Sequence, residues 1–325
     1  NRVVLEKFLN SEKNPIYLAF AISDHPWVDS QDGAAVRIAV TVAERGKLSG
    51  TLGRVIDQKS GADEGSEIWV ESQNGLINSR IRIGADVSSA ADLKANFDLA
   101  HQGVTPLGLG FRVIGKDVEQ FLIEGNLPSV LRPYAIGRDI VRRWEDKYII
   151  DFFPLTENEA SRQFPALFQQ VSISVKLERL AKRDNNKDTL DYANRWWQFA
   201  KPRERMRPAL DGLKHFFATC RTSKHRLFSA LDGATVPDAK VVAIALEDFG
   251  VLGVLQSYVH TFWAEEAGVR MGVGNDLNYN HADCFNKFPF PDPDAATRER
   301  IRDLGERLDA HRKRQQELHP DLTLT

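Results

Sequence analysis

The sequence predicts an α+β protein, because strand patterns fill its first part and helical periodicity fills its later part. Residues 16–23 and 34–42 are rich in β-branched and aromatic side chains, which indicates two strands. From Glu157 onward, apolar residues recur at helical spacing. The segment Arg298–Leu318 is a long amphipathic pattern with its charges opposite an apolar face, so we expect the chain to end in a helix.

Before residue 90 the local signals predict a small set of further elements. Residues 2–9 read as a short helix. Residues 44–66 are polar and rich in Gly and Ser, which predicts a domain boundary. The pair Asn74-Gly75 is a favoured two-residue turn, so residues 68–83 are expected to form a hairpin around it.

The remainder of the chain alternates short strands and helices. Pro165 is expected to kink or restart the helix that begins near Glu157, since proline fits the first turn of a helix better than its interior. The other expected elements are a short helix at 117–124, strands at 147–152 and 241–246, and a helix at 252–266.

The length and the composition indicate a globular chain of two domains, or of one domain with an appendage. The chain has 325 residues, 42% of them hydrophobic and 27% charged. It contains two cysteines, Cys220 and Cys284, which exclude a disulfide framework and fit a reducing, cytoplasmic location. Its longest apolar runs are too short to span a bilayer, so no membrane partner is expected. The start at Asn1 indicates a piece of a longer chain.

The charge is unevenly distributed along the chain. The formal net charge is -2. Between Arg132 and Arg226, however, about 20 Lys and Arg stand against about 12 Asp and Glu. A basic middle between acidic ends is suited to nucleic acid, although a solvated charged face gives the same composition.

The segment 194–226 concentrates this positive charge among aromatic side chains. It holds nine basic residues against two acidic ones, Glu204 and Asp211. Guanidinium groups bind phosphate and read guanine bidentately, and aromatic rings stack on bases or anchor a loop. Adjacent tryptophans usually face different ways, so at least one of Trp196 and Trp197 is expected to be buried. The pattern favours nucleic-acid binding over a core with solvated arginines.

A zinc site and a cofactor site are both disfavoured. His215, Cys220, His225, His281 and Cys284 lack the spacing of a zinc finger, so we predict no bound metal. The Gly108-Leu-Gly110 segment leads into a strand-like run rather than a helix, which argues against a phosphate cradle. No cofactor is therefore expected in this chain.

Several segments together resemble the C-terminal half of the MmeI-like adenine-specific DNA methyltransferases. Residues 20–42 resemble the last strands of that family's catalytic domain, and residues 103–111 resemble the opening of its recognition domain. Further resemblances are the Pro-Tyr-x-x-Gly-Arg-Asp signature at 133–139, the Trp-Trp, Pro-Arg and Ser-Lys-His-Arg signatures at 196–228, and the segments 253–263 and 284–291.

The resemblance implies a parent enzyme that methylates adenine N6 in a restriction-modification or phage-defence system. S-adenosylmethionine would be its cofactor, and the target base would be flipped out of the duplex. Residues 14–17 read Asn-Pro-Ile-Tyr where the family's catalytic loop has Asn-Pro-Pro and an aromatic residue, so the catalytic and cofactor motifs are expected upstream. The partners implied are double-stranded DNA and the parent's own catalytic domain.

The resemblance also implies a domain plan, in which a mixed recognition domain with a helical C-terminal region follows a remnant of the methyltransferase sheet. The boundaries are 1–45 for the end of the catalytic domain, 46–240 for the target recognition domain and 241–325 for the C-terminal helical region.

The predicted DNA contacts are drawn from the basic segment and its signatures. They are Arg138, Arg195, Trp196, Arg203, Arg207, Arg221, Lys224, His225 and Arg226. The alternative is a protein-interaction module whose basic surface docks a partner subunit of a defence complex. Salt dependence separates the two, because phosphate neutralisation makes DNA affinity fall steeply as salt rises.

Overall fold

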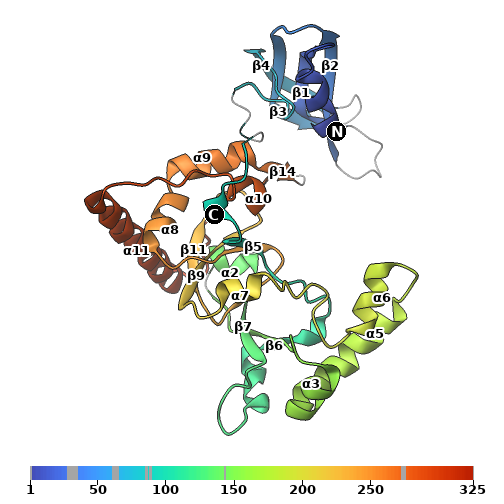
Figure 1. The fold of residues 1–325 in the computed structure, drawn as a ribbon, viewed down its shortest axis with the longest axis vertical. Coiled ribbons are helices and arrows are strands. Elements are labelled where there is room, and N and C mark those ends of the chain that lie inside the picture. Colours follow the sequence, from blue (N-terminus) through green and yellow to red (C-terminus); the bar gives the residue numbers. More distant parts are fainter. Residues whose placement is uncertain are drawn as a thin grey trace. The chain divides into compact units, whose positions relative to one another are not determined.

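The computed structural model describes residues 2–27, 36–60, 66–84, 87, 90–142, 144–271 and 276–324. Its contacts divide the chain into one compact unit that ends at Ala90 and a second that begins at Ala91 (Figure 1). Each unit is described by itself. Strands and helices occur in both, and the α+β prediction is confirmed.

The first unit is a four-stranded sheet with one helix. β1 (Ile16–Trp27) pairs antiparallel with β2 (Val36–Arg45) and parallel with β3 (Gly50–Ser60), which pairs antiparallel with β4 (Ser66–Gly75). The helix α1 (Arg2–Leu9) has the predicted bounds, and its Leu5 and Leu9 pack against the buried Leu18 and Ala21. Ala34 and Ala35 of the second predicted strand lie outside the described residues.

Two predictions about this unit are wrong. The polar segment 44–66 is not a boundary, because β3 lies within it and pairs with β1. Asn74 and Gly75 do not form a turn but end β4, where they oppose Thr51 and Gly50. The boundary expected at 45/46 thus falls between strands of one sheet. That residues 1–45 end a methyltransferase domain stays a prediction.

The second unit contains two larger sheets. The first has the order β11-β9-β13-β5, all antiparallel, and the second has the order β12-β7-β8-β6. Their bounds are β5 (Ala100–Gln102), β6 (Arg112–Ile114), β7 (Leu131–Ala135), β8 (Lys147–Ile150), β9 (His215–Cys220), β11 (Phe228–Asp232), β12 (Val236–Pro237) and β13 (Val241–Ile244). The boundary expected at 240/241 immediately precedes β13, which pairs with β9.

Helices between the sheet segments extend the core of this unit. They are α2 (Gly137–Val141), α3 (Glu157–Gln163), α4 (Pro165–Val171), α5 (Leu177–Ala181), α6 (Lys187–Asn194) and α7 (Met206–Leu210), with a π-helical turn at Ser172–Lys176. The restart of the helix at Pro165 is confirmed. The expected helix at 117–124 is a 3-10 helix at Gly115–Phe121.

The C-terminal helices reach both edge strands of the first of these sheets, β11 and β5. The helix expected at 252–266 is two helices, α8 (Phe249–Leu255) and α9 (Tyr258–Ala267), because the Ser257 hydroxyl accepts from the His260 amide and caps a new start. The short α10 (His281–Cys284) precedes α11 (Ala295–Leu318), the expected long helix. A Cβ on Gly305 of α11 would lie 2.2 Å from the Phe249 carbonyl oxygen, so glycine permits the close approach of α11 to α8.

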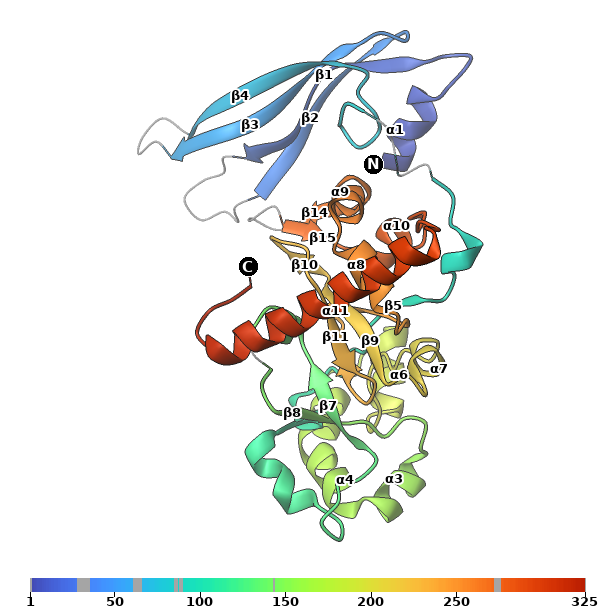
Figure 2. The same cartoon turned by 90° about the vertical axis from the view of Figure 1, so that its left-hand side faces the viewer.

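Side chains from α8 and α11 close the free edge of β11. Asp309 accepts hydrogen bonds from the Ala230 amide (3.0 Å) and the Ser229 hydroxyl (3.2 Å). Just after α8, Gln256 accepts from the Phe228 amide (3.1 Å), and Arg312 donates to the Phe228 carbonyl (3.3 Å). Figure 2 shows α11 crossing beside β11 and α8. Backbone groups that would otherwise stay unpaired at a sheet edge are thereby satisfied.

No helix among the described residues is both long and apolar enough to cross a membrane.

Candidate nucleic-acid interface

Residues 221–225 connect β9 to β11 and include Arg221, Lys224 and His225. We call this segment the 221–225 loop. Thr222 and Ser223 form β10, which pairs with β15 (Asp276–Asn278), and the Tyr279 amide donates to the Arg221 carbonyl at 2.6 Å. Lys224 and His225 are exposed. The loop is thus held by strands on both sides while its basic tip faces solvent, as the sequence predicts.

Arg226, which follows this loop, is buried rather than exposed. Its guanidinium donates to the Thr219 hydroxyl (3.0 Å), to the Cys220 carbonyl and to the Leu277 carbonyl (2.9 Å). The Tyr279 ring lies 5.0 Å away, and only 8% of Arg226 is exposed. Burial lowers the pKa of Arg226. These contacts correct the prediction that Arg226 lies at a DNA face, because the side chain is buried and both of its Nη atoms already bind protein acceptors.

A cleft of about 570 Å³ lies near the predicted contact Arg203, and we call it the basic cleft. Its positively charged or titratable lining residues are His101, Lys201, Arg203, Arg205 and His281. They come from β5, from the loop 201–205 and from the start of α10. Phe97 lines the rim and is 66% exposed, with the Arg205 guanidinium 5.3 Å from its ring centroid. Cation and aromatic side by side are the combination that binds nucleic-acid backbone and base.

Arg203 occupies a strained position in this cleft. Its φ is 60°, in the left-handed region that a bulky residue rarely adopts, and its Nε donates to the Gly103 carbonyl at 3.1 Å. Burial, followed by the nearby Arg221 guanidinium, lowers the pKa of Arg203. The structure therefore brings two predicted contacts, Arg203 and Arg221, close enough to repel each other.

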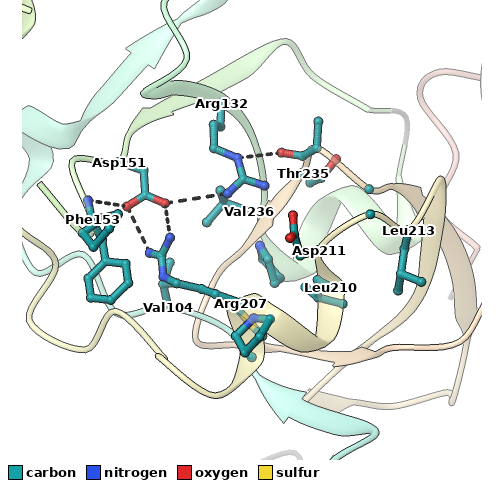
Figure 3. A pocket seen from close by; sticks show the side chains of 17 residues that line it. Val104, Arg132, Asp151, Phe153, Arg207, Leu210, Asp211, Leu213, Thr235 and Val236 are labelled. Carbon is teal, nitrogen blue, oxygen red and sulfur yellow. Dashed lines mark hydrogen bonds and ion pairs between the residues drawn. The ribbon is translucent and has the colours of Figure 1, made fainter. Parts of the chain in front are cut away.

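Arg207 belongs to a different cleft, of about 510 Å³. Its guanidinium binds both carboxylate oxygens of Asp151, at 2.7 and 3.0 Å, and its Nε donates to the Pro202 carbonyl. Arg132 also approaches Asp151, at 3.9 Å, and both arginines point toward that carboxylate in Figure 3. Asp151 is almost fully buried and Arg207 is the nearer of its two arginine partners, so turning Arg207 to DNA would weaken the pairing of a buried charge. The prediction that Arg207 contacts DNA is therefore corrected, because Arg207 forms a structural ion pair with Asp151.

Arg195 and Trp196 directly follow α6. Arg195, which caps the end of α6, donates from two guanidinium nitrogens to the carboxylate of Asp191 within that helix. Trp196 is 3% exposed, and its indole N–H donates to Glu157 at 3.2 Å. Trp197 also bonds protein, through the Leu155 carbonyl. Both tryptophans therefore serve packing, which corrects Trp196 as a DNA contact.

Arg138 remains available at the surface. It is exposed on α2, next to Gly137, whose carbonyl accepts from the Cys220 thiol at 2.9 Å. Because Cys220 ends β9, this contact places Arg138 at the same end of β9 as the 221–225 loop.

Comparison with known proteins decides the family. Residues 100–292 match the MmeI target recognition domain. The chain belongs to this family. The matched range contains the 221–225 loop and, of the residues that line the basic cleft, all but Phe97 and Asp98. No curated protein matches the sequence.

The chain is similar to part of a larger protein of known structure. The type IIL restriction-modification enzyme MmeI, solved in complex with DNA, matches with a TM-score of 0.70 at 17% identity, over 95% of this chain and 39% of that one. This likeness confirms the fold. The type IIG restriction endonuclease BpuSI matches at 10% identity with a TM-score of 0.35, over 94% of this chain and 39% of that one, too low to carry an argument.

The candidate zinc ligands of this target recognition domain lie in separate protein environments. The Cys284 thiol faces the Ala264 carbonyl, and the His215 ring packs 4.9 Å from Phe249 while bonding the Glu247 carbonyl. Across the described part of the chain, no three His, Cys, Asp or Glu side chains gather as a metal site would require. That the protein binds no zinc stays a prediction.

Sequence reasoning missed several residues of the interface. His281 was weighed only as a zinc ligand, and His101 and Phe97 carried no local signal. Arg179 was also missed. It is 5% exposed, and burial lowers its pKa to about 10. Its guanidinium donates to carbonyls of two separate segments, at Pro106, Leu107, Tyr192, Arg195, Trp196 and Gln198.

Proposed function

We propose that this chain is the module that recognises a specific site in double-stranded DNA for an S-adenosylmethionine-dependent adenine-N6 methyltransferase. The family match over residues 100–292 carries this proposal. The exposed 221–225 loop and the basic cleft support it, since they concentrate cations in one part of the fold. A restriction-modification or phage-defence system is the proposed setting.

The division of labour follows from the residues present. Phosphates or base edges would be bound by Lys224, Arg221 and Arg138. Arg226 and Arg207 instead stabilise the fold through bonds to protein groups. The chain itself would hold no cofactor. S-adenosylmethionine and the methyl-transfer chemistry would belong to the parent's catalytic domain, which is the proposed partner of this module within the parent enzyme.

Duplex binding over a range of salt concentrations tests the recognition role. We expect Lys224→Ala to weaken binding to all sequences and to flatten the salt slope by about one unit, because one phosphate contact is lost. Lys214→Ala is the matched control, since Lys214 is an exposed lysine at the opposite end of β9. If the chain binds a partner protein but shows no salt-dependent binding to duplex DNA, the protein-docking alternative holds instead.

Incubation with labelled S-adenosylmethionine and mixed-sequence duplex DNA tests the division of labour. We expect no label on adenine from this chain alone. Transfer by this chain would contradict the proposal that the catalytic chemistry lies elsewhere in the parent enzyme.

A further inference from the structure

The basic cleft carries more positive charge than its own carboxylates balance. Two acidic side chains line it, Asp98 and Glu204. Asp98 is engaged by Arg205 at 2.8 Å, and Glu204 is exposed. Against them stand Lys201, Arg203 and Arg205 in the lining, with Arg221 close enough to lower the pKa of Arg203.

Arg205 is paired with Asp98, but Arg203 is held by a neutral group. The bond that the structure gives the Arg203 guanidinium goes to a neutral carbonyl, that of Gly103. Among the described residues, no carboxylate lies within ion-pair distance of Arg203 or Arg221. Like charges held together raise the free energy of the empty site, and an entering anion relieves that cost.

Two histidines share the cleft with these arginines. His101 Nε2 lies 2.8 Å from the Asp98 carbonyl and must donate to it, because a carbonyl oxygen only accepts. His281 is partly buried at the start of α10. Burial, followed by His101, Arg221 and Arg203, lowers the pKa of His281.

The groups around His281 leave this positive field largely uncompensated. From its own helix Asp283 raises the pKa, but that carboxylate is already bound by Lys287 (3.2 Å) and Asn280 (3.2 Å). From α9, which packs on α10, His260 is occupied by the Leu255 carbonyl and the Tyr279 hydroxyl. The other titratable groups of the cleft and its edge are the carboxylates Asp98 and Glu204, His101 of β5, and the cations of the loop 201–205 and of the end of β9.

We propose that the basic cleft is a phosphate subsite for the DNA backbone, in which His281 takes up a proton from solvent as the phosphodiester enters. This inference rests on the proposed function. The entering anion reverses the local field, so the imidazolium form of His281 becomes favourable at a pH where the empty site holds it neutral. Binding and protonation are therefore linked, and affinity rises as the pH falls.

The first experiment measures affinity for a mixed-sequence duplex at pH 6, 7 and 8 and constant ionic strength. A His225→Asn background removes the exposed imidazole of the 221–225 loop. We expect binding about 3- to 10-fold tighter at pH 6 than at pH 8, since one proton is taken up. His281→Asn should abolish most of this difference and leave thermal unfolding near that of the parent. The matched control is His311→Asn, on the exposed face of α11, which should keep the pH dependence.

The second experiment separates this subsite from the proposed function. Histidine ring signals are followed by NMR as inorganic sulfate, a phosphate mimic with constant charge in this pH range, is added to the full chain. We expect sulfate to raise the pKa of His281 and leave His311 unchanged.

Three outcomes separate the phosphate subsite from DNA recognition. Salt-dependent DNA binding with an unchanged pH dependence in His281→Asn overturns the subsite but leaves DNA recognition standing. A sulfate-shifted His281 without duplex binding supports an anion site but contradicts DNA recognition. An unshifted His281 in sulfate overturns the subsite.

Discussion

Arg226 donates hydrogen bonds to main-chain carbonyls, although it lies in the basic segment 194–226, whose composition indicates DNA binding. Its guanidinium joins the end of β9, through Thr219 and Cys220, to β15, through Leu277. The Gln256 amide in turn donates to the Arg226 carbonyl at 3.0 Å. Arg226 therefore positions the 221–225 loop, which we propose contacts DNA.

Substituting Arg226 by methionine should loosen the 221–225 loop without removing a phosphate contact. We expect weaker duplex binding and a stability loss of about 1–3 kcal/mol, because the Leu277 and Cys220 carbonyls lose their donor. The salt slope should stay unchanged, unlike that of Lys224→Ala. Arg226→Lys should recover part of the affinity. A slope reduced as much as in Lys224→Ala would instead show that Arg226 touches phosphate. Urea unfolding and salt titrations provide both readouts.

At the scale of elements, β11 depends on side chains from outside its sheet. Asp309→Ala removes the acceptor of the Ala230 amide and the Ser229 hydroxyl, and also the partner of Lys313. Since Ala230 is buried, we expect a loss of about 1–3 kcal/mol in the free energy of unfolding.

Asp303→Ala is the matched control on the same helix. Its carboxylate binds Arg307 at 3.3 Å on an exposed surface, so its loss should change stability by less than about 1 kcal/mol. Equal effects of the two substitutions in urea unfolding would show that the edge contacts of β11 contribute nothing.

Local patterns predicted many elements but not their partners. The period of α11, the restart at Pro165 and the helix α1 could be read directly, because each depends on neighbouring residues. The parallel pairing of β1 with β3 could not, because a polar, half-exposed strand looks like a linker. The turn predicted at Asn74-Gly75 was also wrong, because the partner of β4 is the preceding strand β3 and not a strand that follows it.

The same limit applies to the interface. Composition located the basic segment, but the pairing of Arg207 with Asp151 joins residues 56 positions apart and leaves no local trace. The cleft joins His101 to His281 through the fold alone. The exposed Lys224 and His225 were predictable because the Thr and Ser residues before them favour a loop that leads into a strand.

For the whole molecule, one buried histidine should set part of the acid sensitivity of the fold. His260 is 0% exposed, with Nδ1 donating to the Leu255 carbonyl and Nε2 facing the Tyr279 hydroxyl. Burial lowers its pKa to about 4, from an ordinary value of 6.5. The unfolded chain thus binds a proton at a pH where the folded chain does not, and this difference destabilises the fold as the pH falls from 6.5 toward 4.

The expected loss over that window is about 3 kcal/mol, and the contribution is constant above it. Urea unfolding at several pH values measures it. His260→Gln should flatten the pH dependence between 4 and 6.5, whereas His311→Gln on the exposed surface of α11 should not. A parent profile that His260→Gln leaves unchanged would assign the acid sensitivity to other groups.

The carbonyl-directed bonds of Arg179 and Arg226 have a consequence for how this domain can change. Every residue type carries a main-chain carbonyl. The bonds that these two arginines donate to carbonyls therefore do not depend on which side chains the bonded residues carry. Arg221, Lys224 and His225 can then be exchanged one at a time while the scaffold beneath them keeps its shape. Under the proposed function, a few point substitutions in the loop would then change the DNA preference without disturbing the scaffold.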